Sequence, residues 1–289
     1  MPRGVTVLMV AGLVLLSVAG LWGEESGEDG VRIESECPSK EARADSLTQA
    51  ARVLLREKRG GEALACLQRA VAATPTYVAA LKELGTLLST RKEYHAAQKY
   101  LSAAIAHEGP TASALNNLAI AYQELGNHAD AVRMYKRVLK LDEDDAAAHY
   151  NLGTALEKAG EYKDAVKWYK MAIDLEPEEA KYYNNMGGSL AAYNKTETAE
   201  RSYKWAIKLS PKWADAYFNL GNMLLGTNQV EKAIERLQVA VKIQPSHAKA
   251  RAKLADAHTE LENKVKAFKT EVDAAIDKAQ KMMDRGELR

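Results

Sequence analysis

The strongest constraint on the fold is a spacing of 34 residues that runs through most of the chain. Four glycines mark it, at steps of 68, 34 and 34 residues: Gly85, Gly153, Gly187 and Gly221. In this register the sequence divides without a gap into six blocks, 44–77, 78–111, 112–145, 146–179, 180–213 and 214–247, and a seventh block starts at residue 248. Because no insertion is needed, each block is expected to be one copy of the same structural unit.

Each block carries the pattern of two short helices. Positions 4, 7, 8 and 11 of a block form one apolar stripe at helical spacing, and positions 20, 24, 27 and 28 form another. Position 8 is always small and position 20 is always alanine, so the two helices can approach closely. Four blocks end the second helix with a proline, which cannot continue a helix: Pro75, Pro177, Pro211 and Pro245. One helix pair cannot bury both stripes, so the blocks should stack into a solenoid.

This combination of period and positions resembles the tetratricopeptide repeat family, fully over residues 44–247 and in part from residue 248. The resemblance implies an all-α, right-handed superhelical solenoid of six helix-turn-helix repeats with a C-terminal capping helix. It also implies a noncatalytic scaffold or adaptor, which binds an extended peptide or a helix of a partner protein in a concave groove. The first helix of each repeat would line that groove.

An asparagine column lies on the expected groove face, at block position 6. Its members are Asn117, Asn151, Asn185 and Asn219. Side-chain amides both donate and accept hydrogen bonds, so such a ladder could hold a peptide main chain whatever its sequence. In this respect the repeats are most similar to the repeat arm of O-GlcNAc transferases. Its position alone favours a structural role, in which asparagine bonds neighbouring helices, and the two roles are compatible with each other.

Further groove candidates surround the column: Asn116, Tyr150, Asn184, Phe218 and Asn222. Phe218 is expected to be exposed beside Leu225, unless the C-terminal helix folds back over both. An apolar spot in a polar groove often marks a binding site.

The N-terminus has a different composition from the repeats. One cation, Arg3, precedes an uncharged stretch from Val5 to Trp22. Residues 1–23 therefore indicate a secretory signal peptide or an uncleaved membrane anchor. Arg3 favours a cytosolic N-terminus, which would place the repeats in the secretory lumen or outside the cell; the alternative is a reversed anchor with the repeats facing the cytosol. Residues 24–43 are acidic without apolar period, as expected of a disordered tether.

Two features would report on the compartment. Cys37 and Cys66 could form a disulfide in an oxidising lumen, or remain free. Asn194 begins the glycosylation sequon Asn194-Lys195-Thr196, at the expected turn between two helices. The six histidines are scattered, and neither they nor the cysteines have the spacing of a metal site.

No sequence motif indicates catalysis or a cofactor. The chain lacks G-x-S-x-G, H-E-x-x-H, C-x-x-C and a phosphate-binding glycine loop. Its net charge of +1 gives no field that would attract nucleic acid or an anionic membrane surface, so membrane contact is expected only through the N-terminal segment. The expected partner is a protein or peptide. A second alternative is an accessory subunit of a lumenal glycosyltransferase or assembly complex.

Residues 248–289 form a partial repeat followed by a helical stretch without glycine or proline breaks before Gly286. Its apolar residues alternate steps of four and three: Leu254, His258, Leu261, Val265, Phe268, Val272, Ala275, Ala279 and Met282. This heptad pattern predicts either a helix that caps the last repeat or one that leaves the solenoid and dimerises. Two alanines and a histidine make a poor coiled-coil seam, which favours the cap and a monomer.

Overall fold

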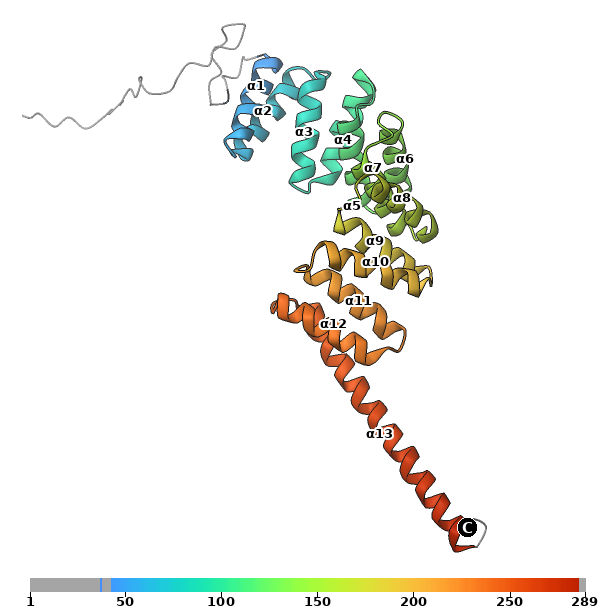
Figure 1. Cartoon of the computed structure of the whole chain (residues 1–289). Helices are drawn as coiled ribbons and strands as arrows, with labels where there is room; N and C mark the ends of the chain where they lie inside the picture. Colours follow the sequence, from blue (N-terminus) through green and yellow to red (C-terminus); the bar gives the residue numbers. More distant parts are fainter. Residues whose placement is uncertain (1–36, 38–42, 286–289) are drawn as a thin grey trace, which may run out of the picture.

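The structure is a computed structural model that describes residue 37 and residues 43–285. The predicted N-terminal signal or anchor and most of the predicted tether lie outside these residues. The described part contains thirteen helices and no strand, and the predicted all-α solenoid is confirmed (Figure 1). Within the described residues, no helix combines the length and the apolar character that spanning a bilayer requires.

Six helix pairs precede one long helix. The first helices of the pairs are α1 (Ala44–Arg56), α3 (Val78–Thr90), α5 (Ala112–Glu124), α7 (Ala146–Lys158), α9 (Ala180–Ala192) and α11 (Ala214–Gly226). The second helices are α2 (Gly60–Ala73), α4 (Tyr94–Glu108), α6 (His128–Leu139), α8 (Tyr162–Leu175), α10 (Thr196–Leu209) and α12 (Val230–Ile243). The last helix is α13 (Ala248–Asp284). The odd-numbered helices start at intervals of 34 residues, as the sequence period requires.

The small residues of the repeat lie where the two helices of a pair cross. Alanine at block position 20 is 0% exposed in every block. Glycine at position 8 faces the side chain at position 24: a Cβ added to Gly153 would lie 2.8 Å from the ring of Tyr169, and one added to Gly221 would lie 2.8 Å from Leu237. Glycine therefore weakens the helix locally and permits a close helix crossing.

The turn inside every pair uses one residue in the left-handed region. This residue always occupies block position 15: Lys58, Lys92, Gly126, Gly160, Asn194 and Asn228. Its φ lies between 58° and 81°. A left-handed residue after a helix lets the next N–H groups bond back to the last turn. All six pairs thus reverse direction in the same way.

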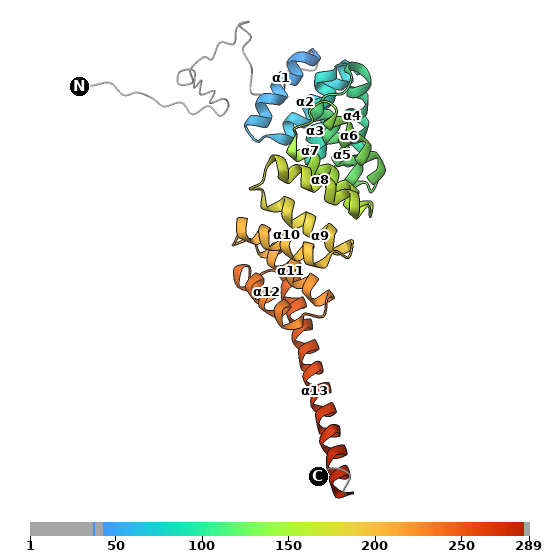
Figure 2. The ribbon, with the colours of Figure 1, turned by 45° about the vertical axis from the view of Figure 1, so that its right-hand side comes forward.

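The stack of repeats curves, as Figures 1 and 2 show. Neighbouring odd-numbered helices touch directly in most steps of the stack (α1 with α3, α3 with α5, α7 with α9, α9 with α11). Even-numbered helices make no comparable contact with one another in the described residues. The odd-numbered helices therefore lie closer together, on the inner side of the curve. We call the surface that they form the inner face.

Helix α13 has two parts. Its first part caps the solenoid as predicted: Ala257 is buried against Val230 and Ile234 of α12, and Leu254 and Leu261 pack beside it. The second part, residues 265–284, extends away from the repeats (Figures 1 and 2) and is exposed except at half-buried Met282. The cap prediction thus describes only the beginning of α13. We call residues 265–284 the projecting segment.

The glycine contact predicts opposite effects for two substitutions in neighbouring repeats. Gly153→Ala places a methyl group within 2.8 Å of the Tyr169 ring, and such overpacking should lower the free energy of unfolding by ~1–3 kcal/mol. Gly188→Ala meets only the hydroxyl of Tyr203 at 3.6 Å and should raise stability by up to ~1 kcal/mol, because alanine favours the helix. Urea denaturation followed by circular dichroism measures both. Equal effects of the two variants would contradict this account of position 8.

Candidate peptide-binding face

Asparagines at block position 6 connect four inner-face helices, α5, α7, α9 and α11, each to the inner-face helix before it. The side-chain Nδ2 of Asn117 donates to Thr86 Oγ1 at 3.0 Å, and Asn151 Nδ2 donates to Asn116 Oδ1 at 3.3 Å. Further along, Asn185 Nδ2 donates to Tyr150 Oη at 2.9 Å. The fourth asparagine makes a similar bond, in which Asn219 Nδ2 donates to Asn184 Oδ1 at 3.0 Å. The predicted structural role of the column is therefore present in the structure.

These bonds also orient the other end of each amide. Asn117, Asn151 and Asn219 are half-buried, and their Oδ1 atoms accept no hydrogen bond from the described residues. Asn185 differs, because its Oδ1 accepts from Asn184 Nδ2 at 3.2 Å. With the donor end of the amide engaged, the remaining acceptor can receive an N–H group from outside the chain. Three such acceptors are thus available along one face.

An aromatic cluster surrounds Tyr150 in the middle of the inner face. Its ring centroid lies 5.0 Å from that of Tyr182 and 5.7 Å from that of Tyr169, both in tilted geometry. The ammonium of Lys181 lies 5.8 Å from the Tyr150 centroid and 5.1 Å from the Tyr182 centroid. Burial raises the pKa of Tyr150 above its ordinary value. The sequence singled out Tyr150 but missed Tyr182, whose role depends on how two repeats stack.

Glu157 of α7 forms hydrogen bonds with two other helices, one of them through Tyr169 of this cluster. Its Oε2 accepts from the Tyr169 hydroxyl at 2.9 Å and from the hydroxyl of Ser189 at 2.8 Å. Tyr169 belongs to α8 and Ser189, fully buried, belongs to α9 of the next repeat. Burial, aided by the nearby carboxylate, raises the pKa of Tyr169 well above the usual tyrosine value.

Two predicted groove residues lie elsewhere than expected. Phe218 is half-buried, with its ring 5.1 Å from the ring of His247 and packed in the cluster that α12 and α13 share. The expected exposure of Phe218 is therefore wrong, and the alternative, in which the C-terminal helix folds back over Phe218 and Leu225, describes the structure. Asn184 is buried, 7% exposed, and its side chain forms hydrogen bonds with Asn185 and Asn219. Asn222 is exposed, as predicted.

His247, which the sequence gave no role, fixes the start of α13. Its Nδ1 accepts from the backbone N–H of Ala250 at 3.1 Å, so Nε2 carries the proton and donates to Asp215 Oδ1, also at 3.1 Å. The histidine is thus an N-cap that anchors α13 to α11.

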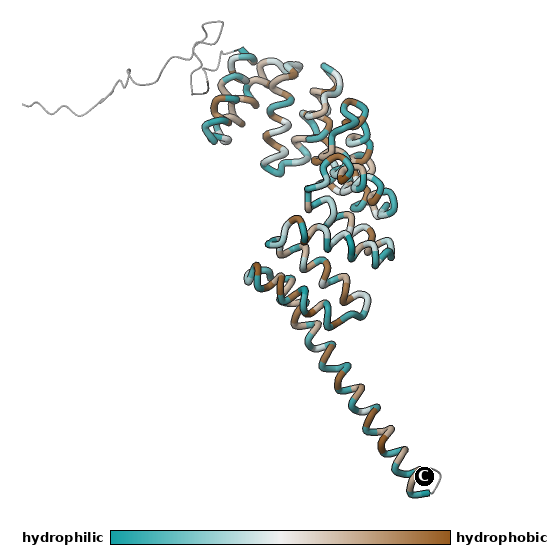
Figure 3. The backbone as a smooth tube through the Cα atoms, viewed as in Figure 1, coloured by the Kyte–Doolittle hydropathy of each residue, from teal (hydrophilic) through white to brown (hydrophobic). Residues whose placement is uncertain are grey.

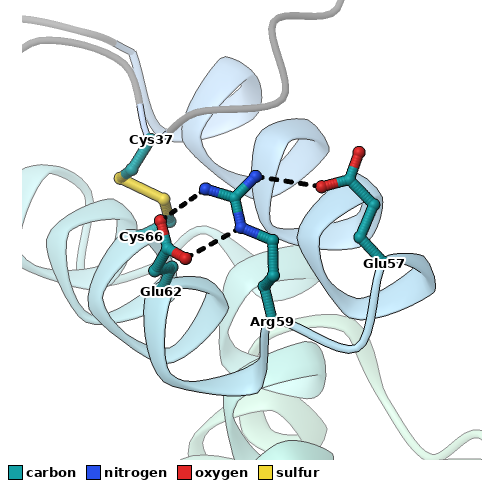
Figure 4. A network of polar contacts seen from close by, with 5 residues as sticks. All are labelled: Cys37, Glu57, Arg59, Glu62 and Cys66. Carbon is teal, nitrogen blue, oxygen red and sulfur yellow. Dashed lines mark hydrogen bonds and ion pairs between the residues drawn. A yellow bond between two sulfur atoms is a disulfide. The ribbon is translucent and has the colours of Figure 1, made fainter.

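Cys37 and Cys66 are paired at the other end of the solenoid. The sulfur atoms lie 2.10 Å apart, and Cys66 on α2 is fully buried. Figure 4 shows the disulfide beside Arg59, which bonds both oxygens of Glu62 at 2.7 and 2.8 Å and Glu57 at 3.0 Å. Arg59 lowers the pKa of the Glu62 carboxyl. The disulfide thus attaches Cys37 to the first repeat.

Asn194 lies in the turn between α9 and α10, with its side chain exposed and a φ of 58°. This position in a turn is accessible to a modifying enzyme. Across the described residues, no group of three or more histidine, cysteine or acidic side chains is arranged to hold a metal ion.

Comparison with known proteins identifies the repeats. Two family models match, both described as tetratricopeptide repeat: one over residues 116–180 and 186–248, the other over residues 77–144. Together they cover more than half of the 289 residues. No curated protein sequence matches the chain.

Many solved structures share the fold. YrrB, described as a TPR protein with an unusual peptide-binding site, is 24% identical with a TM-score of 0.52, covering 64% of this chain and 96% of its own. PilF of Pseudomonas aeruginosa is 16% identical with a TM-score of 0.58, covering 74% and 97% respectively. MamA of Desulfovibrio magneticus RS-1 is 23% identical with a TM-score of 0.55, covering 59% and 96%. At these identities the likeness shows the fold alone.

The buried Tyr169 predicts a loss of stability in alkali. Because its pKa is higher in the folded chain than in the unfolded one, its contribution is complete below pH ~10 and declines as the pH rises above that value. Tyr169→Phe should therefore flatten the fall in unfolding free energy between pH ~9 and ~11. Tyr193→Phe, which removes a hydroxyl from a side chain that is 42% exposed, is the matched control for the substitution itself. Parallel profiles for wild type and Tyr169→Phe would refute the assignment.

Proposed function

Because the chain belongs to the tetratricopeptide repeat family, we propose that it is a noncatalytic scaffold whose inner face holds an extended segment of a partner protein. The observation that carries this proposal is the set of free amide oxygens on Asn117, Asn151 and Asn219. Each amide donates a hydrogen bond to the preceding inner-face helix, so its acceptor oxygen is already oriented before a partner binds. Such preorganisation lowers the entropy cost of binding.

The spacing of these acceptors suits a main chain. Packed helices lie ~8–10 Å apart, and an extended chain advances ~3.3 Å per residue. The acceptors of Asn117 and Asn151, on neighbouring inner-face helices, would therefore meet N–H groups about three residues apart. The acceptor of Asn219, two inner-face helices beyond Asn151, would meet one about six residues further along. Main-chain N–H groups are present in every sequence, so the ladder would contribute affinity with little sequence preference. The likeness to the repeat arm of O-GlcNAc transferases rests on this column and stays a prediction.

Selectivity would come from the Tyr150 cluster. Half-buried Tyr150, which packs on the buried ring of Tyr182, lies beside the Lys181 ammonium, on the helices that carry Asn151 and Asn185. This arrangement suits an aromatic side chain on the partner, or an acidic one that replaces Glu179, whose carboxylate pairs with the exposed Lys181 ammonium at 3.1 Å.

A peptide that binds the purified chain, selected from a random displayed library, tests this function. Replacing main-chain N–H groups by N-methyl groups one at a time should weaken binding most at the positions that meet Asn117, Asn151 and Asn219, the first two about three residues apart and the third about six residues further along. The double variant Asn151→Ala, Asn219→Ala should weaken binding about tenfold, since it removes two hydrogen bonds to the peptide. Isothermal titration calorimetry measures both effects, and circular dichroism checks that helicity is kept.

A matched control uses Asn127→Ala, an exposed asparagine in the α5–α6 turn whose side chain makes no cap bond. It should bind the peptide as wild type does. The proposal fails if the inner-face double variant keeps full affinity, or if no position of the peptide is sensitive to N-methylation.

We further propose that the repeats reside in the secretory lumen or outside the cell. The Cys37–Cys66 disulfide supports an oxidising compartment, because cytosolic thiols are kept reduced. The exposed position of Asn194 in a turn supports use of its sequon.

Glycosidase treatment of the full chain from eukaryotic cells tests this location. A mobility shift is expected for wild type and for Thr196→Ser, which keeps the sequon, and none is expected for Asn194→Gln. Carbonate extraction would then separate a cleaved signal from a retained anchor. An unshifted protein that is also digested by protease added to the cytosolic side would establish the cytosol-facing alternative instead.

A further inference from the structure

The projecting segment of α13 carries large apolar side chains that no repeat covers. The exposed fractions are 60% for Val265, 68% for Phe268, 38% for Val272, 61% for Ile276 and 52% for Met283. In Figure 3, hydrophobic residues recur along this helix to its end. An isolated helix of this kind gains nothing from its apolar stripe in water, whereas a partner helix would bury it.

We propose that the projecting segment pairs with the same segment of a second copy, in antiparallel orientation. Three of these residues, Val265, Phe268 and Val272, lie on the core positions of a heptad that Ala275, Ala279 and Met282 continue, while Ile276 and Met283 lie at its edge. Val265, Val272 and Ala279 occupy one set of core positions, and Phe268, Ala275 and Met282 occupy the other. His258, which weakened the seam predicted from the sequence, lies outside the projecting segment. In antiparallel coiled coils the two sets face each other, so each layer joins unlike residues.

Side-chain volumes select one antiparallel register. When Val272 faces Ala275 of the second copy, Phe268 faces Ala279 and Val265 faces Met282, and the same layers recur by symmetry. Each large residue then meets a small or flexible one, which fills space without overpacking. In a parallel, in-register pair, Ala275 and Ala279 would each face themselves and Phe268 would face Phe268. That arrangement leaves gaps at one end of the seam and crowding at the other.

The charged residues beside the seam favour the same register. Glu271 lies next to Lys278 of the second copy, and symmetry forms this opposite-charge pair twice. A parallel pair would instead bring Lys264 against Lys269 and leave Glu271 beside Ile276. In the antiparallel register the only like charges are Lys264 and Arg285, and Lys264 is already held by Glu260, at 3.2 Å, and by Asn228.

The place of the segment in the molecule also fits. The overlap from Val265 to Met282 is ~27 Å long at 1.5 Å per residue. The second helix would end beside Glu262, close to where α13 leaves α12, so it covers the projecting segment without displacing the cap. Because α13 extends away from the stack (Figures 1 and 2), the two solenoids would lie at opposite ends of the pair and leave both inner faces open.

Sedimentation equilibrium of the full chain tests the proposal. Wild type should approach twice the monomer mass of 31.7 kDa at concentrations up to ~100 μM. Phe268→Glu should weaken dimerisation by at least about tenfold, and it is safe for folding because Phe268 is exposed. Every variant keeps the N-terminal segment, so association through that segment would be common to all. A monomeric wild type, or a dimer unaffected by Phe268→Glu, overturns the proposal.

Charge exchange tests the orientation and register. Glu271→Lys and Lys278→Glu should each weaken the dimer about tenfold or more, because each places like charges together. The double exchange should restore it, and Asp277→Lys, which makes a similar charge change outside the seam, should leave it intact. Failure of the double exchange to restore association would overturn the antiparallel register.

Discussion

The contact between block positions 8 and 24 sets the distance between the two helices of each repeat, and the rest of the structure depends on it. Where position 8 is glycine, a leucine or tyrosine side chain occupies the space that a Cβ would need. That distance fixes how much of the two stripes is left for the next repeat to cover. Because every block keeps a small residue at position 8 and alanine at position 20, every block presents a surface of similar shape to its neighbour, and the stack can continue for six repeats.

The repeat architecture was predictable because it depends on local periodicity. A constant 34-residue period, a small residue at position 8 and alanine at position 20 determine two helices and their crossing. The left-handed residue at position 15 was less accessible to prediction. Glycine and asparagine suggest it in four blocks, but Lys58 and Lys92 adopt the same conformation because the geometry of the turn requires it.

The candidate site was predictable only in part, since it depends on contacts between repeats. The asparagine column was visible in the sequence, but its acceptors, Thr86 and the residues at block position 5, follow from the stacking of neighbouring helices. Phe218 was misplaced for a similar reason. Its burial depends on the path of α13, which His247 fixes through its bonds to Ala250 and Asp215. Neither bond follows from the 34-residue period, so the sequence pattern did not predict it.

The asparagine ladder has a mechanical consequence, because the side chains that join the repeats are the same ones that face outward. A partner that accepted or donated a bond at an amide would polarise and restrain the bond on its other side. Occupying the inner face should therefore stiffen the curve of the solenoid, and by reciprocity a force that straightened the curve would alter affinity for the occupant. In this chain, the same hydrogen bonds would determine both the stiffness of the solenoid and its affinity for a partner.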